Sequence, residues 1–142
     1  MSDRFFLDTN IFVYSLDLNS PAKAKVAQAL VRRAVDTGKG AISYQVVQEF
    51  FNVVLRKFAE PMSPADAEQY LAITFRQLLS VYFSAALCGE ALRLYGQYRL
   101  SWYDALIVAA AIEAECAVLY SEDLQDGRTF GSLRVKNPFS GL

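Results

Sequence analysis

The most constraining stretch of the sequence is the apolar run Phe5-Phe6-Leu7, which ends abruptly in Asp8, Thr9 and Asn10. Apolar residues followed at once by an acid and small polar residues predict a short buried strand whose carboxyl end opens into a polar site. In open α/β sheets, ligands collect in the crevice beyond the carboxyl ends of the strands, so Asp8 occupies a suggestive position. The alternative interpretation is that one of the three polar residues simply caps a helix that starts near Ile11.

Predicted strands and helices alternate along the rest of the chain. Apolar periodicity and capping signals predict helices over residues 11–16, 21–37, 44–58, 64–79, 85–99 and 102–115, and strands over residues 41–43, 81–83, 117–120 and 133–135. The helix over residues 102–115 is apolar on nearly every side, so we expect it to be buried. Parallel neighbours need a crossover that is usually helical. The sequence therefore predicts an α/β fold, a three-layer α/β/α sandwich around a central mainly parallel sheet, as a single domain over residues 1–142.

Several serines are expected to cap these helices. Ser20 precedes Pro21, a residue favoured at the first helical position, and Ser43 and Ser84 stand directly before two other predicted helices. Ser63 with Asp66 and Ser101 with Asp104 have the spacing of a capping box. We expect the serine hydroxyls to bind free backbone N–H groups in the first turns of these helices.

The residues that are missing exclude several kinds of chemistry. The chain of 142 residues contains no histidine, which excludes Ser-His-Asp and Cys-His catalysis and histidine-ligated metals. Cys88 and Cys116 are the only cysteines and form no CxxC motif, so we expect neither a disulfide framework nor a zinc site. The longest apolar run, Ala105 to Ile112, is too short to span a bilayer, and the first residues fit no secretory signal. A cytoplasmic protein that is not membrane-bound is expected.

Strand polarity predicts that four distant acids meet at one edge of the sheet. Asp8 and Asp123 follow strands, and Glu49 and Asp104 lie in the first two turns of helices that begin at the carboxyl edge. Like charges about 4 Å apart repel by about 4 kcal/mol at the effective dielectric near a protein surface. No Lys or Arg lies close in sequence to Asp8 or Asp123. All-oxygen ligands favour Mg²⁺ or Mn²⁺, and two such ions would neutralise the four acids and permit a two-metal phosphodiester hydrolase.

Each acid also has a structural interpretation. Glu49 lies on a polar stripe with Gln45, Gln48 and Asn52, which is typical of a solvated helix face. Asp104 can be a capping-box acid that interacts favourably with the helix dipole. Glu122 and Asp126 compete with Asp123 for one role in the site. Acids in loops are usually just solvated.

Four motifs together resemble the PIN-domain family, and specifically VapC-type toxin ribonucleases of toxin-antitoxin pairs. They are Phe6-Leu7-Asp8-Thr9-Asn10-Ile11, Gln48-Glu49-Phe50, Leu100-Ser101-Trp102-Tyr103-Asp104-Ala105-Leu106-Ile107 with its alanine-rich continuation, and Leu119-Tyr120-Ser121-Glu122-Asp123-Leu124. The similarity runs over essentially the whole chain. The order of the acids and the Asp-Ala-Leu-Ile segment are the specific part, because Leu-Asp-Thr-Asn alone is a weak signal.

The resemblance implies a Mg²⁺- or Mn²⁺-dependent endoribonuclease with Asp8, Glu49, Asp104 and Asp123 as its acidic quartet. Asn10 and Ser121 match small polar positions that orient the acids or the substrate. The resemblance also implies an RNA substrate, a homodimer, and a cognate antitoxin whose tail packs against the toxin groove.

Two other functions remain open from the sequence. An aspartyl-phosphate phosphatase or receiver-like protein also places an Asp at the end of its first strand. Such sites require a suitably placed Lys, and a phosphatase usually has a second acid at the position of Asn10. A PIN-like module could bind RNA or protein without cleavage. The net charge of −1 is unusual for a nucleic-acid-binding protein, so RNA would have to bind locally through residues such as Arg99, Arg128 or Lys57.

Overall fold

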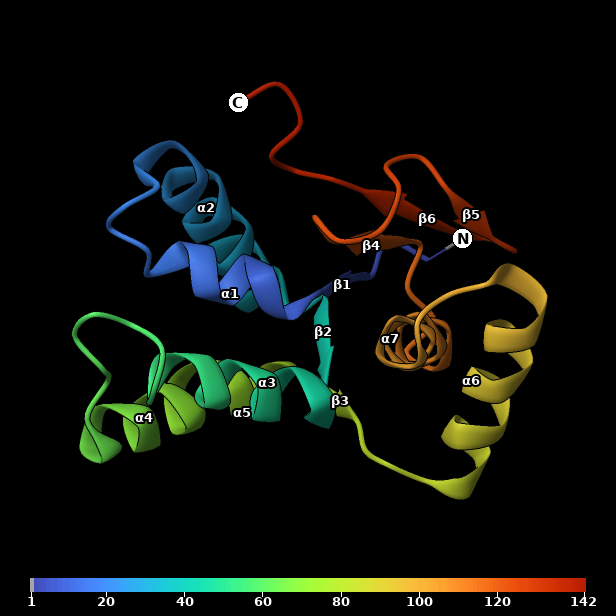
Figure 1. The fold of residues 1–142 in the computed structure, drawn as a ribbon, viewed down its shortest axis with the longest axis horizontal. Coiled ribbons are helices and arrows are strands. Elements are labelled where there is room, and N and C mark those ends of the chain that lie inside the picture. Colours follow the sequence, from blue (N-terminus) through green and yellow to red (C-terminus); the bar gives the residue numbers. More distant parts are fainter. Residues whose placement is uncertain (1) are drawn as a thin grey trace.

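A six-stranded sheet forms the centre of the computed structural model, which describes residues 2–142 (Figure 1). Its spatial order is β3-β2-β1-β4-β6-β5. The strands are β1 (Phe5–Leu7), β2 (Gly40–Ser43), β3 (Leu79–Val81), β4 (Val118–Tyr120), β5 (Thr129–Phe130) and β6 (Leu133–Lys136). All neighbouring pairs are parallel except β5 with β6, which is antiparallel. The predicted α/β class with a mainly parallel sheet is confirmed.

Helices cover both faces of this sheet. They are α1 (Thr9–Ser15), α2 (Pro21–Thr37), α3 (Tyr44–Val54), α4 (Pro64–Tyr70), the π-helical η1 (Leu71–Phe75), α5 (Arg76–Leu78), α6 (Ala85–Tyr98) and α7 (Trp102–Glu113). Figure 1 shows α6 and α7 on one side of the sheet and the other helices on the opposite side. None of the helices in residues 2–142 combines the length and the apolar character needed to cross a membrane.

The helix α7 is the most deeply buried element. Every residue from Ala105 to Ala111 is buried, and the helix packs between the sheet and α6. Small alanine side chains let it lie close to both layers. The expected burial of this apolar helix is confirmed, although it ends two residues early, where Glu115 adopts a left-handed conformation with φ of 59°.

Serine capping explains three of the helix starts. The hydroxyl oxygens of Ser63, Ser84 and Ser101 each accept a hydrogen bond from the backbone N–H three residues ahead, at 3.0 to 3.1 Å. The expected caps from Ser20 and Ser43 are wrong, because neither side chain bonds the helix that follows. Pro21 at the first position suffices to start α2.

Three predicted boundaries also differ from the structure. Helix α3 ends at Val54 instead of residue 58. The chain folds back there, because the Met62 N–H donates to the Val54 carbonyl. The predicted helix over residues 64–79 is divided by the π-helical turn η1. Strand β3 lies two residues before the prediction, because Leu79 and Val81 are the residues that pair with β2.

The amino end of β2 has no room for a side chain. A Cβ atom built on Gly40 would overlap the Ala34 side chain and lie 2.8 Å from the Ala34 Cα, because α2 crosses the strand there. By contrast, a Cβ on Gly96 of α6 would meet no atom within 4 Å.

We expect Gly40→Ala to lower the free energy of unfolding by about 1 to 3 kcal/mol, since α2 must move away from the sheet. The matched control Gly96→Ala should raise it by about 0.5 to 1 kcal/mol, because alanine is the better helix former. Urea denaturation followed by circular dichroism measures both. Equal stability of Gly40→Ala and the wild-type protein would contradict this packing.

Candidate active site

Asp8 lies where β1 ends and α1 begins, and the residue is 4% exposed. The Thr9 N–H donates to Oδ1 and the Ser121 hydroxyl donates to Oδ2, both at 2.7 Å. Asp8 is therefore the N-cap residue of α1, as the structural interpretation of the sequence proposed. It also lies at the carboxyl edge of the sheet, so the capping role and a place in the polar site coexist.

Burial makes the Asp8 carboxylate a weak acid. Loss of hydration, helped by the charges of Asp123 and Glu49, raises its pKa to about 7, although the hydrogen bonds from Ser121 and Thr9 act in the opposite direction. Two hydrogen bonds thus do not fully compensate the buried charge. A carboxylate in this position is an attractive ligand for a cation.

Glu49 is held at this edge by residues of other elements. The Thr9 hydroxyl donates to Glu49 Oε1 at 2.7 Å, and the Gln45 amide donates to Oε2 at 3.3 Å. Gln45 is buried and also donates to the Tyr103 carbonyl at the start of α7, at 3.3 Å. Glu49 is half-buried, so the interpretation as a freely solvated helix face does not describe it.

Asp104 lies in the first turn of α7. Its backbone N–H donates to the Ser101 hydroxyl at 3.1 Å, which is the expected cap. Partial burial raises the pKa of its carboxyl group, and the charges of Asp123 and Glu49 raise it further, against a hydrogen bond from Ser101. The carboxylate therefore lies within electrostatic range of two other acids of the predicted quartet.

Ser121 connects Asp8 to the loop that carries Asp123. Its hydroxyl is completely buried, donates to Asp8 and accepts a hydrogen bond from the Asp123 N–H at 3.1 Å. The structure thus brings Asp8, Glu49, Asp104 and Asp123 to one edge of the sheet. Their roles as catalytic groups or metal ligands stay predictions.

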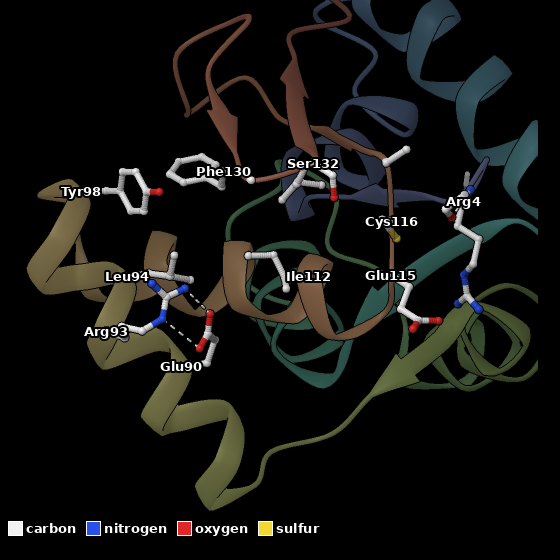
Figure 2. A pocket seen from close by; sticks show the side chains of 14 residues that line it. Arg4, Glu90, Arg93, Leu94, Tyr98, Ile112, Glu115, Cys116, Phe130 and Ser132 are labelled. Carbon is white, nitrogen blue, oxygen red and sulfur yellow. Dashed lines mark hydrogen bonds and ion pairs between the residues drawn. The ribbon is translucent and has the colours of Figure 1, made fainter.

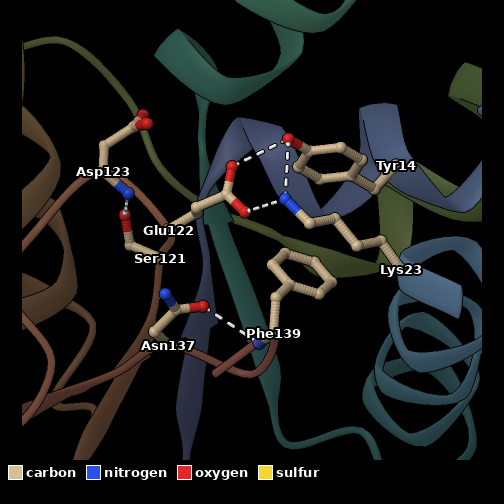
Figure 3. Close-up of polar contacts among 7 residues, drawn as sticks. All are labelled: Tyr14, Lys23, Ser121, Glu122, Asp123, Asn137 and Phe139. Carbon is tan, nitrogen blue, oxygen red and sulfur yellow. Dashed lines mark hydrogen bonds and ion pairs between the residues drawn. The ribbon is translucent and has the colours of Figure 1, made fainter. Parts of the chain in front are cut away.

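The two acids that compete with Asp123 in the sequence are engaged elsewhere. Glu122 binds Lys23 at 2.5 Å and accepts a hydrogen bond from the Tyr14 hydroxyl at 2.8 Å (Figure 3). Lys23 also lies over the Tyr14 ring, 4.5 Å from its centroid. Asp126 accepts from the Asn137 N–H at 2.9 Å.

An open groove of about 600 Å³ runs past this acidic edge. Its lining includes Glu49 and Asp123 together with Asn10, Asn52 and Lys57. The side-chain amide of Asn10 is buried, and neither its oxygen nor its nitrogen has a hydrogen-bond partner among residues 2–142. Buried polar groups are normally satisfied, so these atoms are available to a ligand or water in the groove.

The donor set suits a hard divalent cation. Carboxylate and amide oxygens are ligands of Mg²⁺ and Mn²⁺, and the charge of such an ion would offset the mutual repulsion of the acids. Within residues 2–142, no three Asp, Glu, Cys or His side chains are close enough to hold one ion between them. The residues fit the way Mg²⁺ is usually bound, through one or two carboxylates with water or phosphate oxygens as the remaining ligands.

A second cavity, of about 720 Å³, lies at the opposite edge of the sheet (Figure 2). Arg4, Ala117 and Ser132 line it, and they precede β1, β4 and β6. Its rim carries the Arg93–Glu90 ion pair. This cavity is larger than the groove at the acidic edge, but none of the four predicted acids lines it, so it is not the predicted site.

Several residues around the site were not found by sequence reasoning. Thr9 and Gln45 hold Glu49, and Tyr14 and Lys23 hold Glu122, although Lys23 is 99 residues away from it. The polar stripe on α3 was the available signal for Gln45. Of the basic residues proposed for RNA, Lys57 lines the groove, whereas Arg128 packs on the rings of Tyr98 and Phe130 and donates to the Tyr98 carbonyl.

Comparisons with known proteins identify relatives of this chain. A family model for the PIN domain matches residues 5–126. A toxin-antitoxin complex from Klebsiella pneumoniae has a TM-score of 0.65 and 19% identity, over 94% of this chain and 97% of that one. Rickettsia felis VapBC2, bound to a promoter DNA fragment, has a TM-score of 0.59 and 23% identity, over 94% of this chain and 97% of that one. Mycobacterium tuberculosis VapC20, described as a toxin that cleaves the sarcin-ricin loop, has a TM-score of 0.61 and 18% identity, over 92% of this chain and 98% of that one. No curated protein sequence matches.

The buried Asp8 carboxylate leads to a stability prediction. In the folded protein its pKa is about 7, above the value of 3.8 for an exposed Asp, so ionisation opposes folding. The loss of folding stability caused by this ionisation is absent below about pH 4, grows as the pH rises from about 4 to 7, and is complete above about pH 7. Asp8→Asn should therefore stabilise the protein by about 1 to 3 kcal/mol at pH 8 in the presence of a chelator, and by much less at pH 5.

Urea denaturation at the two pH values measures this difference. Glu68→Gln is the matched control, because Glu68 is an exposed acid on α4, and its effect should stay within about 0.5 kcal/mol at both. A gain for Asp8→Asn that is independent of pH would show that burial of the charge is not its cause.

Proposed function

The chain belongs to the PIN-domain family, and from this premise we propose that it is a Mg²⁺- or Mn²⁺-dependent endoribonuclease, the toxin of a type II toxin-antitoxin pair. The observation that carries the proposal is the set of hydrogen bonds that holds Asp8, Glu49 and Asp123 at one edge of the sheet, beside the start of α7 with Asp104, in a chain without histidine. Carboxylates grouped in this way can hold the divalent ions that hydrolyse phosphodiester bonds.

Each acid has a proposed role. Asp8 and Asp104 are the principal metal ligands, and Glu49 and Asp123 complete or shape the site. A bound divalent ion would supply an acidified water molecule and stabilise charge on the phosphate and the leaving oxygen.

The polar neighbours keep these acids in place. Ser121 holds the Asp8 carboxylate and the Asp123 backbone, and Thr9 holds Glu49. Asn10 offers an amide to the substrate or to an ordered water, because no group in the described part of the chain forms a hydrogen bond with it. Because these hydrogen bonds already hold Asp8, Glu49 and the Asp123 backbone, little reorganisation is needed when RNA arrives.

The partners follow from the family and its structural neighbours. VapC toxins and toxin-antitoxin complexes are among the similar structures, which supports a cognate antitoxin as the inhibitor of this chain. RNA as the substrate, a homodimer and action in the cytoplasm belong to the same proposal.

The aspartyl-phosphate alternative finds less support. Both Asp8 oxygens already accept hydrogen bonds within the buried edge of the sheet, which restricts their use as a nucleophile. None of the ion pairs in residues 2–142 joins a Lys to Asp8. Trapping of a phosphoryl group on Asp8 would nevertheless favour this alternative.

We expect Asp8→Asn and Asp104→Asn each to reduce Mg²⁺-dependent cleavage of RNA by at least about 100-fold, because each removes a proposed ligand. Growth arrest on expression should be lost in parallel. Asp126→Asn is the matched control, since Asp126 belongs to the same loop as Asp123 but binds the Asn137 backbone, and it should cleave like the wild-type protein. Binding of RNA without any cleavage by the wild-type protein would instead indicate a non-catalytic PIN-like module.

Metal binding can be tested without RNA. Ions that bind only the folded state raise the melting temperature, and a concentration 100 times the dissociation constant adds about 2.7 kcal/mol of stability. Mn²⁺ or Mg²⁺ should stabilise the wild-type protein and Asp126→Asn in this way. The two proposed ligand variants should not respond, and an equal response from Asp8→Asn would remove Asp8 from the metal site.

A further inference from the structure

Four side chains from distant parts of the chain meet beside the acidic edge (Figure 3). Tyr14 belongs to α1, Lys23 to α2, Glu122 to the loop after β4 and Phe139 to the segment after β6, and we refer to them as the anchor cluster. Tyr14 and Glu122 also line the groove that Asp123 lines. The cluster therefore joins two helices to the loop that carries one of the predicted acids.

The contacts of the anchor cluster hold the Glu122 carboxylate at both oxygens. The Lys23 ammonium binds Oε2 at 2.5 Å, and the Tyr14 hydroxyl donates to Oε1 at 2.8 Å and accepts from Lys23 at 3.3 Å. The ammonium also lies 4.5 Å from the centroid of the Tyr14 ring and 5.5 Å from that of the Phe139 ring, within the range of cation–π attraction. These two rings pack edge to face, with centroids 5.0 Å apart.

The ion pair in this cluster is better explained by geometry than by stability. The Lys23 and Glu122 side chains are 32% and 27% exposed. Ion pairs of this kind contribute little net stability, because the loss of hydration and of side-chain freedom offsets most of the attraction. What the closed set of contacts does supply is one position for the Glu122 side chain. This position also restrains the backbone to which Asp123 is attached.

The neighbours of Asp123 in the loop are held on both sides. The buried Ser121 hydroxyl binds the Asp8 carboxylate, the anchor cluster binds Glu122, and Leu124 is buried in the core. Asp123 itself is exposed and lines the groove. Figure 3 shows its carboxylate directed away from Glu122. With its neighbours held in this way, the loop presents Asp123 to the groove.

We propose that the anchor cluster positions Asp123, because it holds Glu122 against α1 and α2 and so turns the adjacent carboxylate toward the acidic edge. The inference rests on the proposed function, in which Asp123 completes or shapes the metal site, and adds Lys23, Tyr14 and Glu122 to it as positioning residues. These residues act through Asp123 and contact neither the metal nor the substrate. An acid presented by a loop needs such support, since a small displacement of a ligand is costly.

Cleavage kinetics test the positioning role. Lys23→Met removes the ammonium and keeps an apolar side chain of similar length, whereas Glu122→Gln keeps the size of the side chain and removes its charge. Each should lower kcat by about 10- to 100-fold, as loss of a partner behind a metal ligand does, and change KM for RNA less than about threefold. Lys39→Met is the matched control, since it breaks the ion pair with Asp3 at the opposite edge of the sheet, and it should keep the wild-type kcat.

A double-mutant cycle shows whether Lys23 and Glu122 act as one unit. If both act through their ion pair, the double variant Lys23→Met/Glu122→Gln should lose no more activity than either single variant. Lys23→Arg keeps a cation for Glu122 and should keep most of the wild-type kcat. Losses that multiply in the double variant would show two independent effects and would overturn the anchor cluster as a positioning unit.

Amide hydrogen exchange tests the inference without RNA or metal. In the presence of a chelator, the Asp123 N–H, which donates to the Ser121 hydroxyl, should lose most of its protection in Lys23→Met. The amide of Ala109, in the middle of α7, is the internal control and should exchange at nearly the same rate in both proteins. An equal acceleration at both amides would show that the substitution only destabilises the fold, which would overturn the inference.

The outcomes separate this inference from the proposed function. Cleavage by the wild-type protein with an unchanged kcat in Lys23→Met would overturn the positioning role alone. A raised KM with an unchanged kcat would show that Lys23 contacts the substrate and would also overturn it. If the wild-type protein does not cleave RNA, the nuclease function fails, whereas faster exchange at Asp123 in Lys23→Met would still support the anchor cluster.

Discussion

The buried carboxylate of Asp8 is the constraint on which the rest of the site depends. β1 lies between β2 and β4, so the residue that ends it is enclosed by both neighbouring strands and by α1. A charge in such a place requires compensation, and two hydrogen bonds leave its pKa near 7. The other acids make the cost larger rather than smaller. A bound cation would offset this repulsion, which is the physical reason for the metal site in the proposed function.

The supporting hydroxyls show how residues far apart in the chain are held to one geometry. Ser121 binds the Asp8 carboxylate, directly after β1, and the backbone of its own loop, and Thr9 binds Glu49 of α3. Hydroxyl groups suit this task because each can donate to a carboxylate and accept from an N–H at the same time. Asp8 is thus placed by a strand end, Asp104 by a helix start and Glu49 by the second turn of α3, whereas Asp123 lies in the loop after β4, where Ser121 holds its backbone.

The sequence predicted the α/β class and the mainly parallel sheet well, because both depend on local signals. Alternating apolar strands and capped helices require a parallel sheet, and strand polarity then places Asp8, Glu49 and Asp104 on one edge. What it could not predict depends on contacts between distant residues. The pairing of Lys23 with Glu122 spans 99 residues, and the two-residue strand β5 exists only because β6 pairs with it. Helix α3 ends early for a similar reason, since the following loop folds back onto Val54.

The proposed chemistry sets two electrostatic demands that oppose each other. Carboxylates that hold a cation also repel a substrate that is a polyanion. Lys57 lines the groove beside Glu49 and Asp123, whereas Lys23 is paired with Glu122 and Arg128 donates to the Tyr98 carbonyl. In the proposed function, a bound divalent ion and Lys57 would therefore supply the positive charge that brings a phosphate group to the acidic edge.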